Sequence, residues 1–146
     1  MEPFELWKLG SDTAGSPFSL RIAVNTIQQD DPVSTSFLWK LHIASREHVF
    51  YTTHYFFEIE KLRDDLHALR ENMCGEMEWR TTDDLMLKIS INPRGHVNLS
   101  GRISFGEGDV GSAIDFWGLA TDQSYLKFLI DNLTHLLEQM KDLPSV

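Results

Sequence analysis

The chain has 146 residues, a length that suits one domain with a substantial core, and we therefore predict that residues 1–146 form a single domain. Its 13 Lys and Arg against 22 Asp and Glu give a net charge of -9, which argues against nucleic acid as a partner and favours a basic protein. Because Cys74 is the only cysteine and no stretch approaches the roughly 20 apolar residues of a membrane helix, we expect a cytoplasmic protein without disulfides or membrane contact.

The N-terminal part of the chain predicts a meander of short strands. Apolar and polar residues alternate along each of them, which is the period of a strand with one buried face. The expected strands are Phe4 to Leu9, Leu20 to Val24, Phe37 to Ala44 and His48 to Thr53. The stretch from Gln28 to Ser36 holds Asp30, Asp31 and Pro32 and is expected to form a loop, and Ser45 to Glu47 to form a tight connection.

An amphipathic helix is expected next, because the apolar period changes to three or four residues. Its apolar positions are Ile59, Leu62, Leu66, Leu69 and Met73. Gly75 is expected to end this helix by taking the left-handed position after the last turn.

The segment from Leu85 to Phe105 has the clearest alternation in the chain. Every second residue is apolar, or glycine at one position, on both sides of the turn formed by residues 92–95: Leu85, Leu87, Ile89 and Ile91, then Val97, Leu99, Gly101, Ile103 and Phe105. Pro93 presets φ at one turn position and Gly95 accepts a positive φ, so the pattern predicts an antiparallel hairpin with one apolar face. Flanking strands are expected from Met77 to Arg80 and from Ser112 to Leu119.

A second amphipathic helix is expected at the C-terminus. Thr121 or Asp122 can cap it, and its apolar stripe consists of Leu126, Leu129, Leu133, Leu136 or Leu137, and Met140. The order of elements predicts an α+β fold in which a mostly antiparallel β-sheet of about seven to eight strands packs with two amphipathic helices, one central and one C-terminal.

Candidate catalytic, nucleotide and metal motifs each have a simpler structural interpretation. The run from Gly106 to Gly111 matches G-x-G-x-x-G, but a strand is expected after it where a dinucleotide site needs a helix, and Glu107 and Asp109 would repel a pyrophosphate. The six histidines do not show the spacing of a helical zinc pair, and Cys74 has no second cysteine beside it. We therefore predict no catalytic residue, no metal site and no cofactor.

Paired carboxylates recur in the expected turns. Neighbours in a turn usually point into water, which suits an acidic docking surface better than acid–base catalysis. The candidate partner-binding residues are Glu107, Asp109, Asp83 and Asp84. The tryptophans are expected in the core or on sheet faces, and Trp7 and Trp117, opposite the main apolar set, are the alternatives that could anchor a partner.

The passage from Asp115 to Leu126, with the sequence Asp-Phe-Trp-Gly-Leu-Ala-Thr-Asp-Gln-Ser-Tyr-Leu, resembles the WapI-type immunity proteins of bacterial polymorphic toxin systems. The order and spacing of elements from Leu20 to Met140 is also similar to that family. The resemblance implies a small cytosolic, non-catalytic protein that binds and blocks a cognate toxin domain encoded beside it. Toxin domains in such systems are often nucleases with basic grooves, which an acidic protein can occupy. Because the family's surfaces vary with the toxin, the resemblance identifies no interface residue.

Two other function classes stay open at this point. One is a small-ligand or regulatory binding module, in which the aromatic-rich sheet and a helix enclose a pocket. The other is an enzyme whose catalytic residues the spacing does not reveal.

Overall fold

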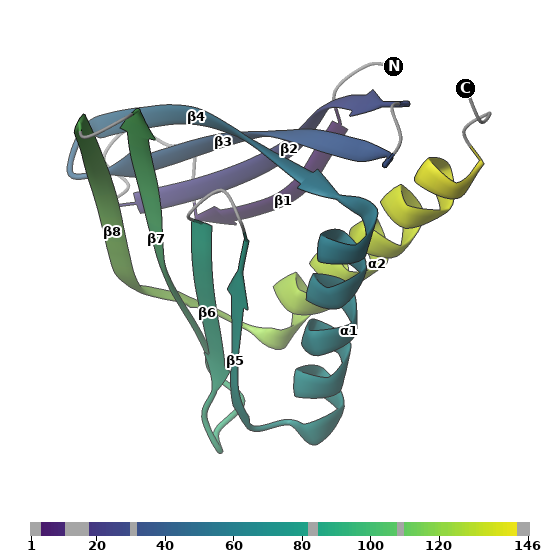
Figure 1. The fold of residues 1–146 in the computed structure, drawn as a ribbon. Coiled ribbons are helices and arrows are strands. Elements are labelled where there is room, and N and C mark those ends of the chain that lie inside the picture. The colour runs from purple at the N-terminus through teal and green to yellow at the C-terminus, as the bar shows by residue number, and fades with distance from the viewer. Residues whose placement is uncertain (1–3, 11–17, 30–31, 82–84, 108–109, 143–146) are drawn as a thin grey trace.

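The computed structural model describes residues 4–10, 18–29, 32–81, 85–107 and 110–142, with side chains at all of these except residues 105–107. In this part of the chain, eight strands form two four-stranded antiparallel sheets, and a helix follows each sheet (Figure 1). The predicted α+β class, with a central and a C-terminal helix, is confirmed. Alternation alone did not reveal that the strands divide into two sheets.

The N-terminal sheet has the strand order β1-β2-β3-β4. Its elements are β1 (Phe4–Gly10), β2 (Phe18–Gln28), β3 (Ser34–Ile43) and β4 (Arg46–Tyr55), and helix α1 (Phe56–Asn72) follows. The loop expected as far as Ser36 is too long at its C-terminal end. Ser34 and Thr35 already pair with Tyr55 and His54 of β4 and so belong to β3.

The C-terminal sheet repeats this order of elements, with four strands in a meander and then a helix. Its elements are β5 (Gly75–Arg80), β6 (Leu85–Ile91), β7 (Val97–Glu107), β8 (Val110–Thr121) and helix α2 (Gln123–Lys141). The predicted hairpin corresponds to β6 and β7. Gly95 has a φ of +82° and its N–H donates to the Asn92 carbonyl at 2.8 Å, which closes the turn as expected.

The two helices differ in how well their ends were predicted. Asp122 caps α2 as expected, because its carboxylate accepts from the Ser124 N–H at 2.8 Å; hydrogen bonds from the Ser124 side chain and backbone lower the pKa of Asp122. The prediction for the end of α1 was wrong. Met73, not Gly75, takes the left-handed position with a φ of 58°, and its N–H donates to the last carbonyls of the helix. Gly75 instead begins β5.

The inner faces of both sheets and the apolar stripes of both helices form one hydrophobic core. Strands of the N-terminal sheet run across those of the C-terminal sheet, and the helices close one side (Figure 1). At the centre, a void of only about 10 Å³ is lined from both sheets and both helices by residues that include Trp7, Trp39, Trp79, Leu62 and Leu129. No helix in the described ranges is long and apolar enough to cross a membrane.

Trp7 lies in this core, although it was expected on the opposite face of its strand. The pairing of β1 with β2 shifts register between Glu5 and Trp7, so that Glu5 pairs with Ala23 and Trp7 with the buried Ile22. A bulge of this kind places two consecutive residues on one side of a strand. Leu6 and Trp7 are therefore both buried.

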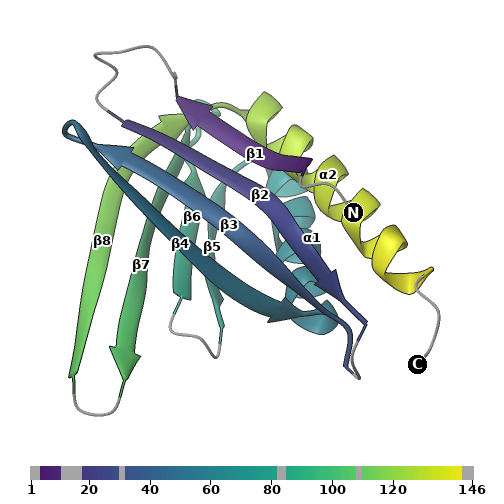
Figure 2. The same ribbon diagram turned by 90° about the horizontal axis from the view of Figure 1, so that it is seen from above.

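A helix covers the first strand of each sheet. Helix α2 lies along the edge strand β1, where the Asn132 side-chain amide donates to the Leu6 carbonyl at 2.7 Å (Figure 2). Helix α1 packs against β5, and the Trp79 indole donates to the Glu58 carbonyl at 3.0 Å. The other edge strands are β4 and β8.

Candidate partner-binding surfaces

The acidic residues selected from the sequence fall mostly outside the described part of the chain. Strands β5 and β7 run in the same direction and finish at the same end of the C-terminal sheet. Asp83, Asp84 and Asp109 lie outside the described residues, and Glu107 ends β7 with its side chain outside the described part. The proposed acidic surface therefore stays a prediction.

The described side chains at this end include two arginines. An open hollow of about 500 Å³ is lined by Arg80, Thr81, Leu85, Met86, Arg102 and Ser104. Arg80 lies 2.8 Å from Glu78, and Arg102 lies 3.8 Å from Asp115. On the outer face of the C-terminal sheet, both arginines are thus paired with acidic side chains of the same face.

The glycine motif lies where two strands of the C-terminal sheet are joined. Gly106 lies in β7, which ends at Glu107, and Gly111 lies in β8, which begins at Val110, so strand surrounds the motif, as expected for a hairpin. No group of three His, Cys, Asp or Glu among the described residues could hold a metal ion. Cys74 is a free, exposed thiol.

His54 is a polar side chain buried in the core between two aromatic rings. Its ring centroid lies 5.3 Å from that of Phe37 and 4.9 Å from that of Trp79. The Trp39 indole donates to the Thr52 hydroxyl oxygen at 2.7 Å, and the same oxygen lies 2.7 Å from Nε2 of His54. Burial lowers the pKa of His54 to about 4, so the ring is neutral at pH 7 and can accept the hydroxyl proton.

The outer face of the N-terminal sheet combines exposed apolar side chains with a row of basic ones. One rung across the sheet consists of Glu5, Ala23, Leu38 and Tyr51, and the next of Lys8, Arg21, Lys40 and Val49. Tyr51 is 61% exposed and Val49 is 51% exposed. Arg21 pairs with Glu5 at 2.9 Å. Exposed tyrosine and arginine beside aliphatic groups are typical of protein interfaces.

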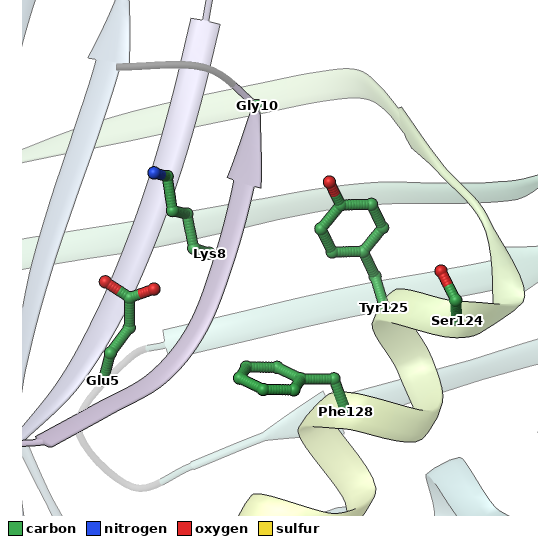
Figure 3. A pocket seen from close by; sticks show the side chains of 6 residues that line it. All are labelled: Glu5, Lys8, Gly10, Ser124, Tyr125 and Phe128. Carbon is green, nitrogen blue, oxygen red and sulfur yellow. The ribbon is translucent and has the colours of Figure 1, made fainter.

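Two hollows extend this face to helix α2. Glu5 lines both of them. One, of about 260 Å³, lies over the sheet beside Arg21, Leu38 and Lys40. The other, of about 450 Å³, lies between β1 and α2, where Tyr125 and Phe128 point towards Glu5 and Lys8 (Figure 3). Figure 2 shows α2, β1, β2, β3 and β4 side by side across this surface.

A comparison with known protein families assigns the chain. The model of the immunity protein WapI-like family matches residues 9–141, which is almost the whole sequence. The chain belongs to this family. No curated protein matches it in a sequence search. For a WapI-like immunity protein, the surfaces described above are candidates for contact with a toxin.

Trp117 is the second exposed aromatic feature of this WapI-like protein. It is 76% exposed on β8, which agrees with the alternative that places it outside the core. The pairing of β7 with β8 skips between Leu99 and Gly101, whose partners are Leu119 and Phe116, so Trp117 and Gly118 form a bulge. Gly118 has a φ of +73°, which glycine adopts without strain.

The exposed face of β4 was missed at the level of sequence. Residues 48–57 read His-Val-Phe-Tyr-Thr-Thr-His-Tyr-Phe-Phe and contain no Asp, Glu, Lys or Arg. Apolar groups lie on both faces of this strand, since Phe50 is buried while Val49 and Tyr51 are exposed. The available signal was the uncharged run itself, which is unusual for an edge strand.

The centre of the core, between the two sheets, is not a ligand pocket. The void lined from both sheets and both helices is about 10 Å³, close to the lower limit for one water molecule. Ligand pockets usually enclose roughly 300 to 1,000 Å³. Among the described residues, this interior is therefore packed rather than hollow.

Proposed function

We propose that this WapI-like immunity protein binds and blocks a cognate toxin domain encoded beside its own gene, and that it does so without catalysis. The observation that carries the proposal is the family match over residues 9–141. The wide outer face of the N-terminal sheet supports it, because that face has the composition of a protein-binding surface.

The net charge favours a basic toxin domain, such as a nuclease, as the partner. The chain has 22 Asp and Glu against 13 Lys and Arg, a net charge of -9. Exposed carboxylates attract a basic groove over several ångströms and raise the rate of association. We place this attraction at Asp83, Asp84, Glu107 and Asp109.

The deciding experiment uses the neighbouring gene. The C-terminal domain of the protein encoded immediately upstream is expressed in a host cell with and without this chain, and growth is followed. We expect the domain to stop growth and this chain to restore it, whereas an immunity protein from an unrelated locus should not. Killing that this chain does not relieve would contradict the proposal, as would a harmless neighbour, and a thermal-shift screen for ligands would then follow.

A further inference from the structure

We infer that the outer face of the N-terminal sheet, together with the adjoining side of α2, is the surface that holds the toxin domain. We further infer that the toxin presents apolar side chains flanked by carboxylates to it. This inference rests on the proposed function and adds the place of contact and its chemistry. The central residues of the surface are Leu38, Lys40, Val49 and Tyr51, and its margins are Lys8, Arg21, Tyr125 and Phe128.

The last strands of the two sheets, β4 and β8, differ in how their free edges are protected. Two features of strand β8 hinder pairing with a strand of another chain: the bulge at Trp117 and Gly118, and the charge of Asp115. Strand β4 pairs with β3 without a register shift over ten residues. It has no charged residue from His48 to Tyr55. A regular, uncharged edge strand of this kind promotes aggregation unless a partner covers it.

The outer faces of the two sheets also differ in where their apolar side chains lie. On the C-terminal sheet, outward charges pair across strands, as with Lys88 and Glu76 at 3.3 Å, and the exposed Val110 and Trp117 lie on the last strand, at its start and at its bulge. On the N-terminal sheet, Tyr51 and Val49 lie open beside Leu38 and Ala23. The row continues past β4, where the rings of Tyr55 and Phe57 stack at 5.9 Å. Contiguous exposed apolar surface rimmed by polar groups marks a protein-binding site.

The dimensions of the face suit a specific protein complex. Four strands about 4.8 Å apart and one helix about 10 Å wide give a width of roughly 25 Å. From Glu47 to Tyr55, β4 extends roughly 27 Å at about 3.3 Å per residue. The resulting area is of the same order as the roughly 800 Å² that each partner contributes to a standard interface.

The charges of the face decide the chemistry of its occupant. Lys8, Arg21 and Lys40 form one basic row, against the carboxylates of Glu5 and Glu47 on neighbouring rungs. The face is therefore locally positive in a chain whose net charge is -9. Carboxylates of a toxin would meet Lys40, which makes no ion pair with any described residue. A second copy of this chain would set its own basic row against this one, and two chains that each carry a net charge of -9 repel each other. The face therefore favours a different protein as its partner.

The test measures binding of the upstream-encoded toxin domain to purified full-length variants. We expect Tyr51→Ala and Lys40→Glu each to weaken binding roughly 10- to 100-fold, the range of residues at an interface centre. The matched control on the C-terminal sheet is Lys88→Glu, also an outward lysine. This control should bind like the wild type, and melting curves establish that all three variants are folded.

The outcomes separate the inference from the proposed function. If the wild type binds the toxin and both Tyr51→Ala and Lys40→Glu bind equally well, the contact surface is wrong while the immunity function stands. If the wild type neither binds nor protects, the proposed function fails and this assignment fails with it. If the chain alone forms a dimer that Tyr51→Ala dissociates, a second copy occupies the face and the assignment to the toxin is overturned.

Discussion

The N-terminal and C-terminal halves of the protein have the same order of elements but treat their outer faces differently. Each half is a four-stranded meander followed by a helix, and each sheet buries tryptophan, Trp7 and Trp39 in the first and Trp79 in the second. On the outside, one sheet shows tyrosine, valine and a basic row, and the other shows paired charges. Because both faces belong to one chain and one topology, the fold does not require the difference. We attribute it to binding.

The helices tie the two halves together. Helix α2 belongs by sequence to the second half but lies along β1 of the first, and α1 packs against β5 of the second. Each half therefore covers an edge of the other. With β1 and β5 covered by helices, β4 and β8 are the remaining edge strands, and each is the last strand of its sheet. The two strands can therefore be compared directly.

The largest expected effect is a loss of stability. It tests whether the inner faces of the two sheets contribute equally to the core. We expect Trp39→Ala and Trp79→Ala each to lower the free energy of unfolding by about 3 to 5 kcal/mol, since each leaves a cavity and removes an indole hydrogen bond. Urea denaturation monitored by circular dichroism measures both. A loss below about 1 kcal/mol in one variant would show that the halves do not contribute equally to the core.

The second-largest expected effect is on the pH dependence of the free energy of unfolding. It arises from His54, which lies in the first half. Its pKa is lowered from 6.5 to about 4 in the folded protein, so between these values the unfolded chain binds a proton that the native chain does not. The stabilisation is complete above pH 6.5 and is lost as the pH falls towards 4, by about 3 kcal/mol from this group. Unfolding free energies measured at several pH values should show this slope.

The matched variants are His54→Phe, which keeps a ring between Phe37 and Trp79, and His96→Phe on the exposed turn after β6. The first should flatten the slope between pH 6.5 and 4, and the second should keep it. Equal slopes in all three proteins would mean that His54 is not kept neutral by burial.

Alternation predicted which faces point inward and failed where a bulge intervenes. Trp39 and Trp79 were expected in the core and lie there, because β3 and β5 pair without a shift. Alternation placed Trp7 on the face opposite Leu6, but both residues are buried, because the bulge between Glu5 and Trp7 turns two consecutive side chains to the same side of the strand. A bulge is a pairing between two strands, so the pattern of one strand does not reveal it.

The candidate site was less predictable than the fold for a related reason. The carboxylates of Asp83, Asp84 and Asp109 were selected because they are charged and in turns, and the structure does not describe them. The exposed face of β4 was overlooked because Val49, Phe50 and Tyr51 are all apolar or aromatic, so alternation assigns neither side to the core. Which side is exposed depends on the partner sheet and helices, which only the tertiary structure shows.

A smaller effect, on the rate of association, should distinguish long-range attraction of the toxin by the acidic residues from direct contact with the N-terminal sheet. We expect a variant with Asp83, Asp84, Glu107 and Asp109 all changed to Lys to associate with the toxin domain about 10-fold more slowly and with weaker salt dependence. Tyr51→Ala should instead act on the dissociation rate. Binding kinetics at low and high salt distinguish the two. Unchanged affinity and salt dependence in the fourfold variant would remove the acidic surface from the proposal.

The smallest effect concerns the paired charges of the C-terminal sheet. Lys88 and Glu76 are both about half exposed, and exposed pairs contribute little because water and salt screen them. We expect Lys88→Met to change the free energy of unfolding by less than about 0.5 kcal/mol and to leave toxin affinity unchanged. Chemical denaturation and a binding titration on the same sample measure both. A clear loss of affinity in this variant would mean that the toxin covers the C-terminal sheet as well, and the difference between the outer faces would then reflect two contact surfaces rather than a bound face and a solvated one.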